Sequence, residues 1–139
     1  MEYGAVIVWW GALVVLAGAG LPIAALLLGA LPDRGAALAL PASFVVLFVP
    51  IYWIGQLRFG AGVVVLGAIL LAAASVLASR RAPSVERGRF LEWLVVFTLA
   101  YALLVAIRAV DPSVIPGGGE KFLDYGLLQS LLRATQLPP

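Results

Sequence analysis

Residues 59–81 read FGAGVVVLGAILLAAASVLASRR, an apolar run that ends in two arginines. The run contains no charged side chain before Arg80. About 20 apolar helical residues are needed to cross the roughly 30 Å hydrocarbon core of a bilayer. The stretch therefore predicts one membrane-spanning helix at about residues 59–78, with its arginines at one membrane surface.

The rest of the chain repeats this pattern. Residues 3–32 and 35–57 also carry no charged side chain, and further spans are predicted at about residues 4–31, 35–54 and 90–110. Pro22 predicts a tilt, a kink or a break into two half-helices in the first span. Pro50 predicts a kink near the end of the second. We expect an all-α, polytopic membrane protein, with four transmembrane helices in residues 1–110.

Composition supports a membrane protein and excludes several functions. The 139 residues are 63% hydrophobic and 12% charged, whereas soluble domains are about 25% charged. Most of the nine basic residues flank apolar runs, which matches membrane topology better than nucleic-acid binding. Cysteine and histidine are absent, so disulfides, thiolate nucleophiles and Cys/His zinc sites are excluded. No metal site is predicted, and no particular cofactor is indicated.

The arginines also predict the orientation. The segment 79–89 between the third and fourth spans contains four arginines, whereas the segment between the second and third offers only Arg58. Cytoplasmic loops carry the excess of Lys and Arg. We therefore expect a multi-pass protein of the cell membrane, with the arginine-rich loop inside the cell and both termini extracytoplasmic.

Two features of the spans have alternative interpretations. Glu92 and Arg108 are charges near the ends of the fourth span, and snorkelling to the headgroups explains them better than a functional role. The third span has small residues at helical spacing, which suit close helix packing or reflect the abundance of alanine in apolar helices. This small-residue stripe comprises Ala68, Ala72, Ser75 and Ser79.

Residues 111–139 are predicted to form an extracytoplasmic loop and an interfacial helix. The sequence PGGG at 116–119 is a break, and residues 120–133 then read as an amphipathic helix along the outer membrane surface. Leucines make its apolar face, at Leu123, Leu127, Leu128, Leu131 and Leu132. Polar residues are expected elsewhere on its circumference, at Glu120, Asp124, Gln129, Arg133 and Gln136.

Glu120 and Asp124 are four residues apart, so both carboxylates project from one side of the predicted helix. Such a pair can bind a divalent metal or deprotonate a hydroxyl group. It can equally be a solvated face with Lys121 and Arg133 as neighbours. Spacing alone favours the solvated face.

The segment GEKFLDYGLLQSLLR at 119–133, followed by LPP at 137–139, resembles the EKF-x-D … PP segment of a large archaeal and Chloroflexi membrane-protein family. That family is named for a downstream triple-tyrosine motif and has no known function. The sequences LPDRG at 31–35 and YWIG at 52–55 also resemble its N-terminal region. Its members are much longer and are similar to GT-C glycosyltransferases, which use lipid-phosphate-linked sugars.

The resemblance implies a site in the last twenty residues. In GT-C enzymes an acidic residue of an early extracytoplasmic loop acts as a base or lies near a metal. Asp124 matches that role best and Glu120 second, while Lys121 and Arg133 are the candidates for contact with a polyprenyl-phosphate sugar. The chain stops at Pro139, before the tyrosine motif, so we expect a fragment or a stand-alone remnant that is inactive alone.

Two other functions are compatible with the sequence. A non-enzymatic membrane assembly subunit would use the small-residue stripe of the third span to pack against a partner membrane chain. A small transporter is disfavoured, because the centres of the spans lack the charges that usually mark a substrate path.

Overall fold

The computed structural model describes residues 3–85, 87–110 and 120–137, with only the main chain for Tyr3 and for residues 120–125. The elements are α1 (Tyr3–Leu28), the short 3₁₀-helix η1 (Ala36–Leu38), α2 (Ala39–Gly55), α3 (Ala61–Ser79), α4 (Arg87–Val110) and α5 (Glu120–Arg133). All regular structure in these ranges is helical, which confirms the predicted fold class. Four helical segments there are long and apolar enough to cross a membrane: α1, η1 with α2, α3 and α4.

Helix α1 continues through Pro22 from Tyr3 to Leu28, so the predicted break into two half-helices does not occur. A proline inside a helix removes one main-chain hydrogen bond and crowds the preceding turn. Packing on both sides of the proline holds the helix together: Ala17 and Ala24 have no exposed surface, and Ile23 is 8% exposed. Neighbouring helices make such prolines tolerable within membranes.

Helices α1, α2 and α3 pack together through small residues. A Cβ atom added at Gly20 of α1 would overlap the main-chain carbonyl of Ala39 at the start of α2. The main chains of α1 and α2 therefore touch directly at this position. Helix α3 joins them through Leu71 and Ala78, which form a buried cluster with Ile23. Lipid tails are as apolar as leucine, so close packing of this kind associates helices in a bilayer.

The packed face of α3 differs from the predicted small-residue stripe. Gly67, Leu71 and Ala78 are buried, whereas most of the stripe is exposed. Exposed stripe positions are Ala68, Ala72 and Ser79, and Ser75 is half-buried. Each exposed position is one residue beyond a buried one, a rotation of about 100° around the helix. The stripe therefore lies to one side of the packed face rather than within it.

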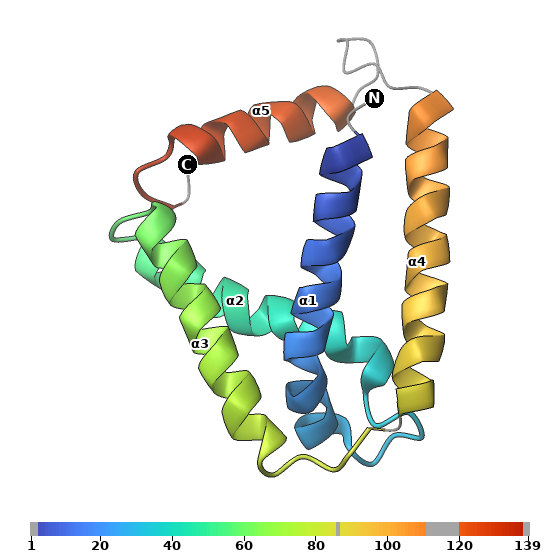
Figure 1. Ribbon diagram of the computed structural model, residues 1–139. Coiled ribbons are helices and arrows are strands. Elements are labelled where there is room, and N and C mark those ends of the chain that lie inside the picture. The colour runs from blue at the N-terminus through green and yellow to red at the C-terminus, as the bar shows by residue number, and fades with distance from the viewer. Residues whose placement is uncertain (1–2, 86, 111–119, 138–139) are drawn as a thin grey trace.

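Helix α4 lies beside α1 (Figure 1), and α1 and η1 are the two described elements that it contacts. No described residue of α4 is buried. Hydrogen bonds from described side chains join it to α1: the Trp10 indole N–H donates to the Thr98 hydroxyl at 3.1 Å, and the Tyr101 hydroxyl donates to the Val6 carbonyl at 2.9 Å. Successive aromatic rings stack along α4 with centroids 5.2 to 6.2 Å apart, at Phe90, Trp93, Phe97 and Tyr101.

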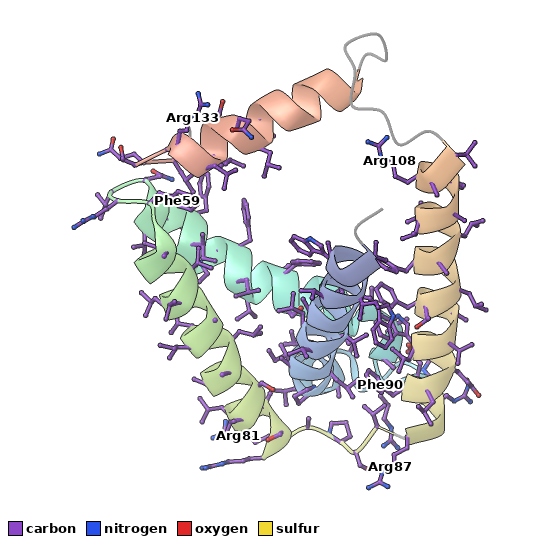
Figure 2. All side chains as sticks on the ribbon, turned by 45° about the horizontal axis from the view of Figure 1, so that its top comes forward. Phe59, Arg81, Arg87, Phe90, Arg108 and Arg133 are labelled. Atoms are coloured by element: carbon purple, nitrogen blue, oxygen red, sulfur yellow. The ribbon has the colours of Figure 1, made fainter. Side chains whose placement is uncertain are left out.

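The two ends of the helical region differ in character (Figure 1). One end, called the arginine end, contains the C-terminal ends of α1 and α3 and the start of α4. The opposite end contains the start of α1, the end of α4 and helix α5, which lies across it. Figure 2 shows Arg81 and Arg87 at the arginine end, and Arg108 and Arg133 at the α5 end.

Candidate functional site

The segment after α5 is attached to the turn between α2 and α3. The Phe59 main-chain N–H donates to the Thr135 carbonyl at 2.7 Å, and the Leu137 N–H donates to the Gly55 carbonyl at 2.8 Å. The Gln136 side-chain amide adds a bond to the Leu57 carbonyl at 3.3 Å. These bonds fix the C-terminal end of α5 against the bundle.

Gly55 leaves room for this close approach. A Cβ atom at Gly55 would lie 2.8 Å from Cδ1 of Leu137 and 3.3 Å from the Phe59 ring. The absence of a side chain at Gly55 lets Leu137 sit directly against the end of α2. Main-chain pairing and side-chain packing therefore act at the same point.

Helix α5 carries all four predicted site residues, at two different places along its length. Glu120, Lys121 and Asp124 belong to its N-terminal half, and their side chains lie outside the described part of the structure. Arg133 is an exposed residue at its C-terminal end, near the α2–α3 turn (Figure 2). A helix rises 1.5 Å per residue, so the main chains of Lys121 and Arg133 are about 18 Å apart.

The helical register of α5 corrects one expectation. The acids were expected away from the leucine face, but residues seven apart in a helix are related by almost two full turns. Position 120 therefore lies within about 20° of Leu127, and position 124 within about 20° of Leu131. The continuous helix from Glu120 to Arg133 places acidic positions at one end of a face and leucines at the other.

The leucine part of α5 is not covered by the bundle. Leu127, Leu128 and Leu132 are 59%, 53% and 71% exposed. An amphipathic helix at a membrane surface buries such residues at the boundary between headgroups and acyl chains. The position of α5 across one end of the spans suits this arrangement (Figure 1).

A second organised region lies at the arginine end, where Asp33 caps the helix that follows. Its carboxylate accepts hydrogen bonds from the main-chain N–H groups of Gly35 at 3.1 Å and Ala37 at 3.0 Å. The bonds from Ala37 and Gly35 hold the pKa of Asp33 below its usual value. The sequence carries a signal for this role, because an Asp before an apolar helical run is a known capping signal.

Arg34 connects the α1–α2 turn to the arginine-rich loop. Its φ of 52° is left-handed, and Gly35 follows at 77°, which makes the sharp turn after α1. The Arg34 guanidinium donates a hydrogen bond to the Ser84 carbonyl. The same loop packs against α1, because a Cβ at Gly29 would lie 3.0 Å from the Pro83 ring.

Two grooves lie beside α1, one against α4 and one against α3, and the groove against α4 is mostly apolar. The one between α1 and α4 has a volume of about 460 Å³, and its polar side chains, Trp10, Thr98 and Tyr101, take part in the two interhelical hydrogen bonds. In the part of the chain with described side chains, no cluster of three or more His, Cys, Asp or Glu residues could hold a metal ion.

Together these features define a multi-pass α-helical membrane protein in which helix α5 lies across one end of the spans. Residues 43–139 match the family described as uncharacterized membrane protein (DUF2298), and the chain belongs to that family. The match begins within α2 and includes α3, α4 and α5. No curated protein and no solved structure matches the chain.

Proposed function

We propose that this chain forms the N-terminal membrane part of a GT-C-like glycosyltransferase that uses polyprenyl-phosphate-linked sugars. We also propose that the chain is related to the triple-tyrosine family that its sequence resembles. The observation that supports it best is helix α5, which crosses one end of the spans and is attached to the α2–α3 turn by main-chain hydrogen bonds. A membrane-surface helix of this kind suits a substrate with an apolar chain and a polar head.

The order of residues along α5 supports the same substrate class. Its acidic positions 120 and 124 share a face with Leu127 and Leu131. This face is therefore acidic toward the N-terminal end of the helix and apolar toward its C-terminal end. In this proposal Asp124 is the base that accepts the proton of the acceptor hydroxyl, and Glu120 is the second candidate for this role. Lys121 contacts the donor phosphate, and Arg133, about 18 Å away, contacts a different part of the substrate.

The proposed orientation puts residues 111–139 outside the cell, as an extracytoplasmic loop and interfacial helix, and the arginine end inside. Figure 1 supports this with the location of α5 and the arginine-rich loop at opposite ends of the spans. The chain has no cysteine, so single cysteines can report accessibility. Ser130→Cys on α5 should react with a membrane-impermeant maleimide in intact cells, whereas Ser84→Cys should react only after permeabilisation. The reverse result would overturn the orientation.

The role of Asp124 is tested in a full-length relative that carries the same EKFLD segment. Asp124→Asn should lower sugar transfer from a polyprenyl-phosphate donor by roughly 10²-fold or more, which is the usual contribution of a general base. Gln129→Ala on the same helix is the matched control and should leave transfer close to normal. Undiminished transfer by Asp124→Asn would remove this residue from the mechanism.

A second function, a membrane assembly subunit, is favoured by the exposed faces of α3 and α4. Ala68 and Ala72 are exposed, and no described residue of α4 is buried. In this alternative a helix of a partner membrane chain packs against the stripe on α3. Ala72→Leu should then abolish copurification of that chain, whereas Leu70→Ala on the same helix should not. A protein that is a stable monomer in detergent and in native membranes would contradict this alternative.

A further inference from the structure

A groove between α1 and α3 opens at the arginine end and combines an apolar channel with two arginines. We propose that it binds an anionic glycerophospholipid, with an acyl chain along the groove and the phosphate on Arg80 and Arg81. The groove has a volume of about 420 Å³. Its lining residues come from the C-terminal ends of α1 and α3 and from Arg80 and Arg81 just beyond α3. These helix ends lie at the opposite end of the molecule from α5 (Figure 1), so the groove is independent of the proposed transferase site.

The walls of the groove are suited to an acyl chain. Ile23 and Ala78 are buried at its base, and Leu27 and Leu77 line its exposed sides at 73% and 62% exposure. All four residues belong to membrane-spanning helices, so the bilayer supplies the molecule that fills the groove. Hydrocarbon chains are the only abundant component at that depth.

The charges at the mouth select the headgroup. Arg80 and Arg81 both line the groove and are both exposed. Neither makes an ion pair or side-chain hydrogen bond with any residue whose side chain is described, whereas Arg34 bonds to the Ser84 carbonyl and Arg89 lies 3.7 Å from Glu92. Two adjacent guanidinium groups attract a phosphate, and the groove lining contains no acid to attract a positive headgroup. The groove therefore favours a lipid whose headgroup carries no cation beside its phosphate. Basic pockets between membrane helices bind anionic headgroups in this way.

The main chain holds these arginines in place. The N–H groups of Arg81 and Ala82 both donate to the Ala78 carbonyl, at 3.0 and 2.8 Å, which continues the turn beyond α3. The loop that follows is fixed to the end of α1 by the Pro83 contact with Gly29 and by the bond from Arg34 to Ser84. Arg80 and Arg81 therefore have a defined position relative to the groove (Figure 2 labels Arg81).

The test uses the full chain in phosphatidylcholine nanodiscs that contain a small fraction of phosphatidylglycerol, with bound lipid measured by native mass spectrometry. Each Lys or Arg near a membrane surface contributes about 1 kcal/mol to anionic lipid binding. Arg80→Gln with Arg81→Gln should therefore weaken phosphatidylglycerol binding roughly 30-fold. Arg87→Gln with Arg89→Gln removes the same charge from the first turn of α4, at the same end of the molecule but outside the groove, and should change binding less than about threefold.

A second variant tests the groove without changing charge. Leu77→Trp fills the channel and should displace phosphatidylglycerol while Arg80 and Arg81 remain, with far-UV circular dichroism confirming unchanged helix content. Equal loss of phosphatidylglycerol binding in both double-arginine variants would contradict the proposal, because it would show that diffuse surface charge attracts the lipid. If millimolar glycerol phosphate competed as effectively as the lipid does, the site would be one for free anions and not for a lipid. Unchanged binding in the arginine and tryptophan variants would overturn the proposal outright.

Discussion

Tyr101 of α4 donates a hydrogen bond from its hydroxyl to the main-chain carbonyl of Val6 in α1, 2.9 Å away, and this bond joins two helices that otherwise touch sparsely. The bond from Trp10 to Thr98 lies close to it on the same two helices. Both donors lie within spans, where water is not available as a replacement partner. We infer that these two bonds set the position of α4 against α1.

Tyr101→Phe should loosen the α1–α4 contact. The phenylalanine keeps the ring stacked on Phe97 but loses the hydroxyl, and interhelical hydrogen bonds in membranes contribute about 0.6 to 1.7 kcal/mol each. The free energy of unfolding in mixed micelles, followed by far-UV circular dichroism during titration with sodium dodecyl sulfate, should fall by that amount. Tyr52→Phe is the control, because no bond of the Tyr52 hydroxyl appears among the described residues. Equal losses in both variants would contradict this account.

Gly20→Ala should separate α1 from α2, because its new methyl group overlaps the Ala39 carbonyl. Overpacking of this kind costs about 1 to 3 kcal/mol, and main-chain atoms cannot move aside as a side chain does. Gly18→Ala on the same helix is the matched control, since nothing lies within 4 Å of its added methyl group. The same titration should show a large loss of stability for Gly20→Ala and none for Gly18→Ala. A stable Gly20→Ala protein would disprove the direct main-chain contact.

Asp33 should make the stability of the arginine end depend on pH. Its folded pKa is lowered by the N–H groups of Ala37 and Gly35, so its contribution is present above the unfolded pKa and is lost as pH falls through the folded one. Stability should be flat above about pH 5 and should decline below about pH 4. Asp33→Asn keeps an acceptor for the cap but does not titrate.

The Asp33 contribution is isolated by comparing wild type with Asp33→Asn at each pH, because the other carboxylates titrate in both proteins. The difference in unfolding free energy should shrink as pH falls from 7 to 3. Asp33→Ala, which removes the cap, should cost about 0.5 to 2 kcal/mol at pH 7. A pH-independent difference between wild type and Asp33→Asn would show that the carboxylate charge does not stabilise the cap.

Gly55→Ala should weaken the attachment of α5, because the new methyl group crowds the Leu137 side chain at 2.8 Å. Hydrogen exchange measures the result directly, since the amides of Phe59 and Leu137 donate to Thr135 and Gly55. Both amides should exchange slowly in wild type and faster in Gly55→Ala. Gly60→Ala, in the same turn with open space around its added methyl group, should leave them protected. Rapid exchange of both amides in wild type would show that the attachment does not persist in solution.

The candidate site could be predicted from sequence only in part. The spacing of Glu120 and Asp124, and the resemblance around them, suffice to nominate the residues. Their relation to Leu127 and Leu131, and the distance from Lys121 to Arg133, follow from the continuous helix α5. The attachment of that helix uses main-chain groups of residues 55, 59, 135 and 137, and every residue type except proline carries the same main-chain N–H and C=O groups. Sequence therefore gave no signal for it.

By itself the sequence determined the all-helical class and the number of apolar spans, because the spacing of charges had to match the thickness of a bilayer. Only the tertiary structure decided which surfaces meet. Helix α3 packs through Gly67 and Leu71 rather than Ala68 and Ala72, and α1 stays continuous past Pro22. In a bilayer every face of a span is apolar, so hydropathy cannot distinguish a packed face from a lipid-facing one. Close approach of particular main-chain atoms, as at Gly20 and Ala39, makes that choice.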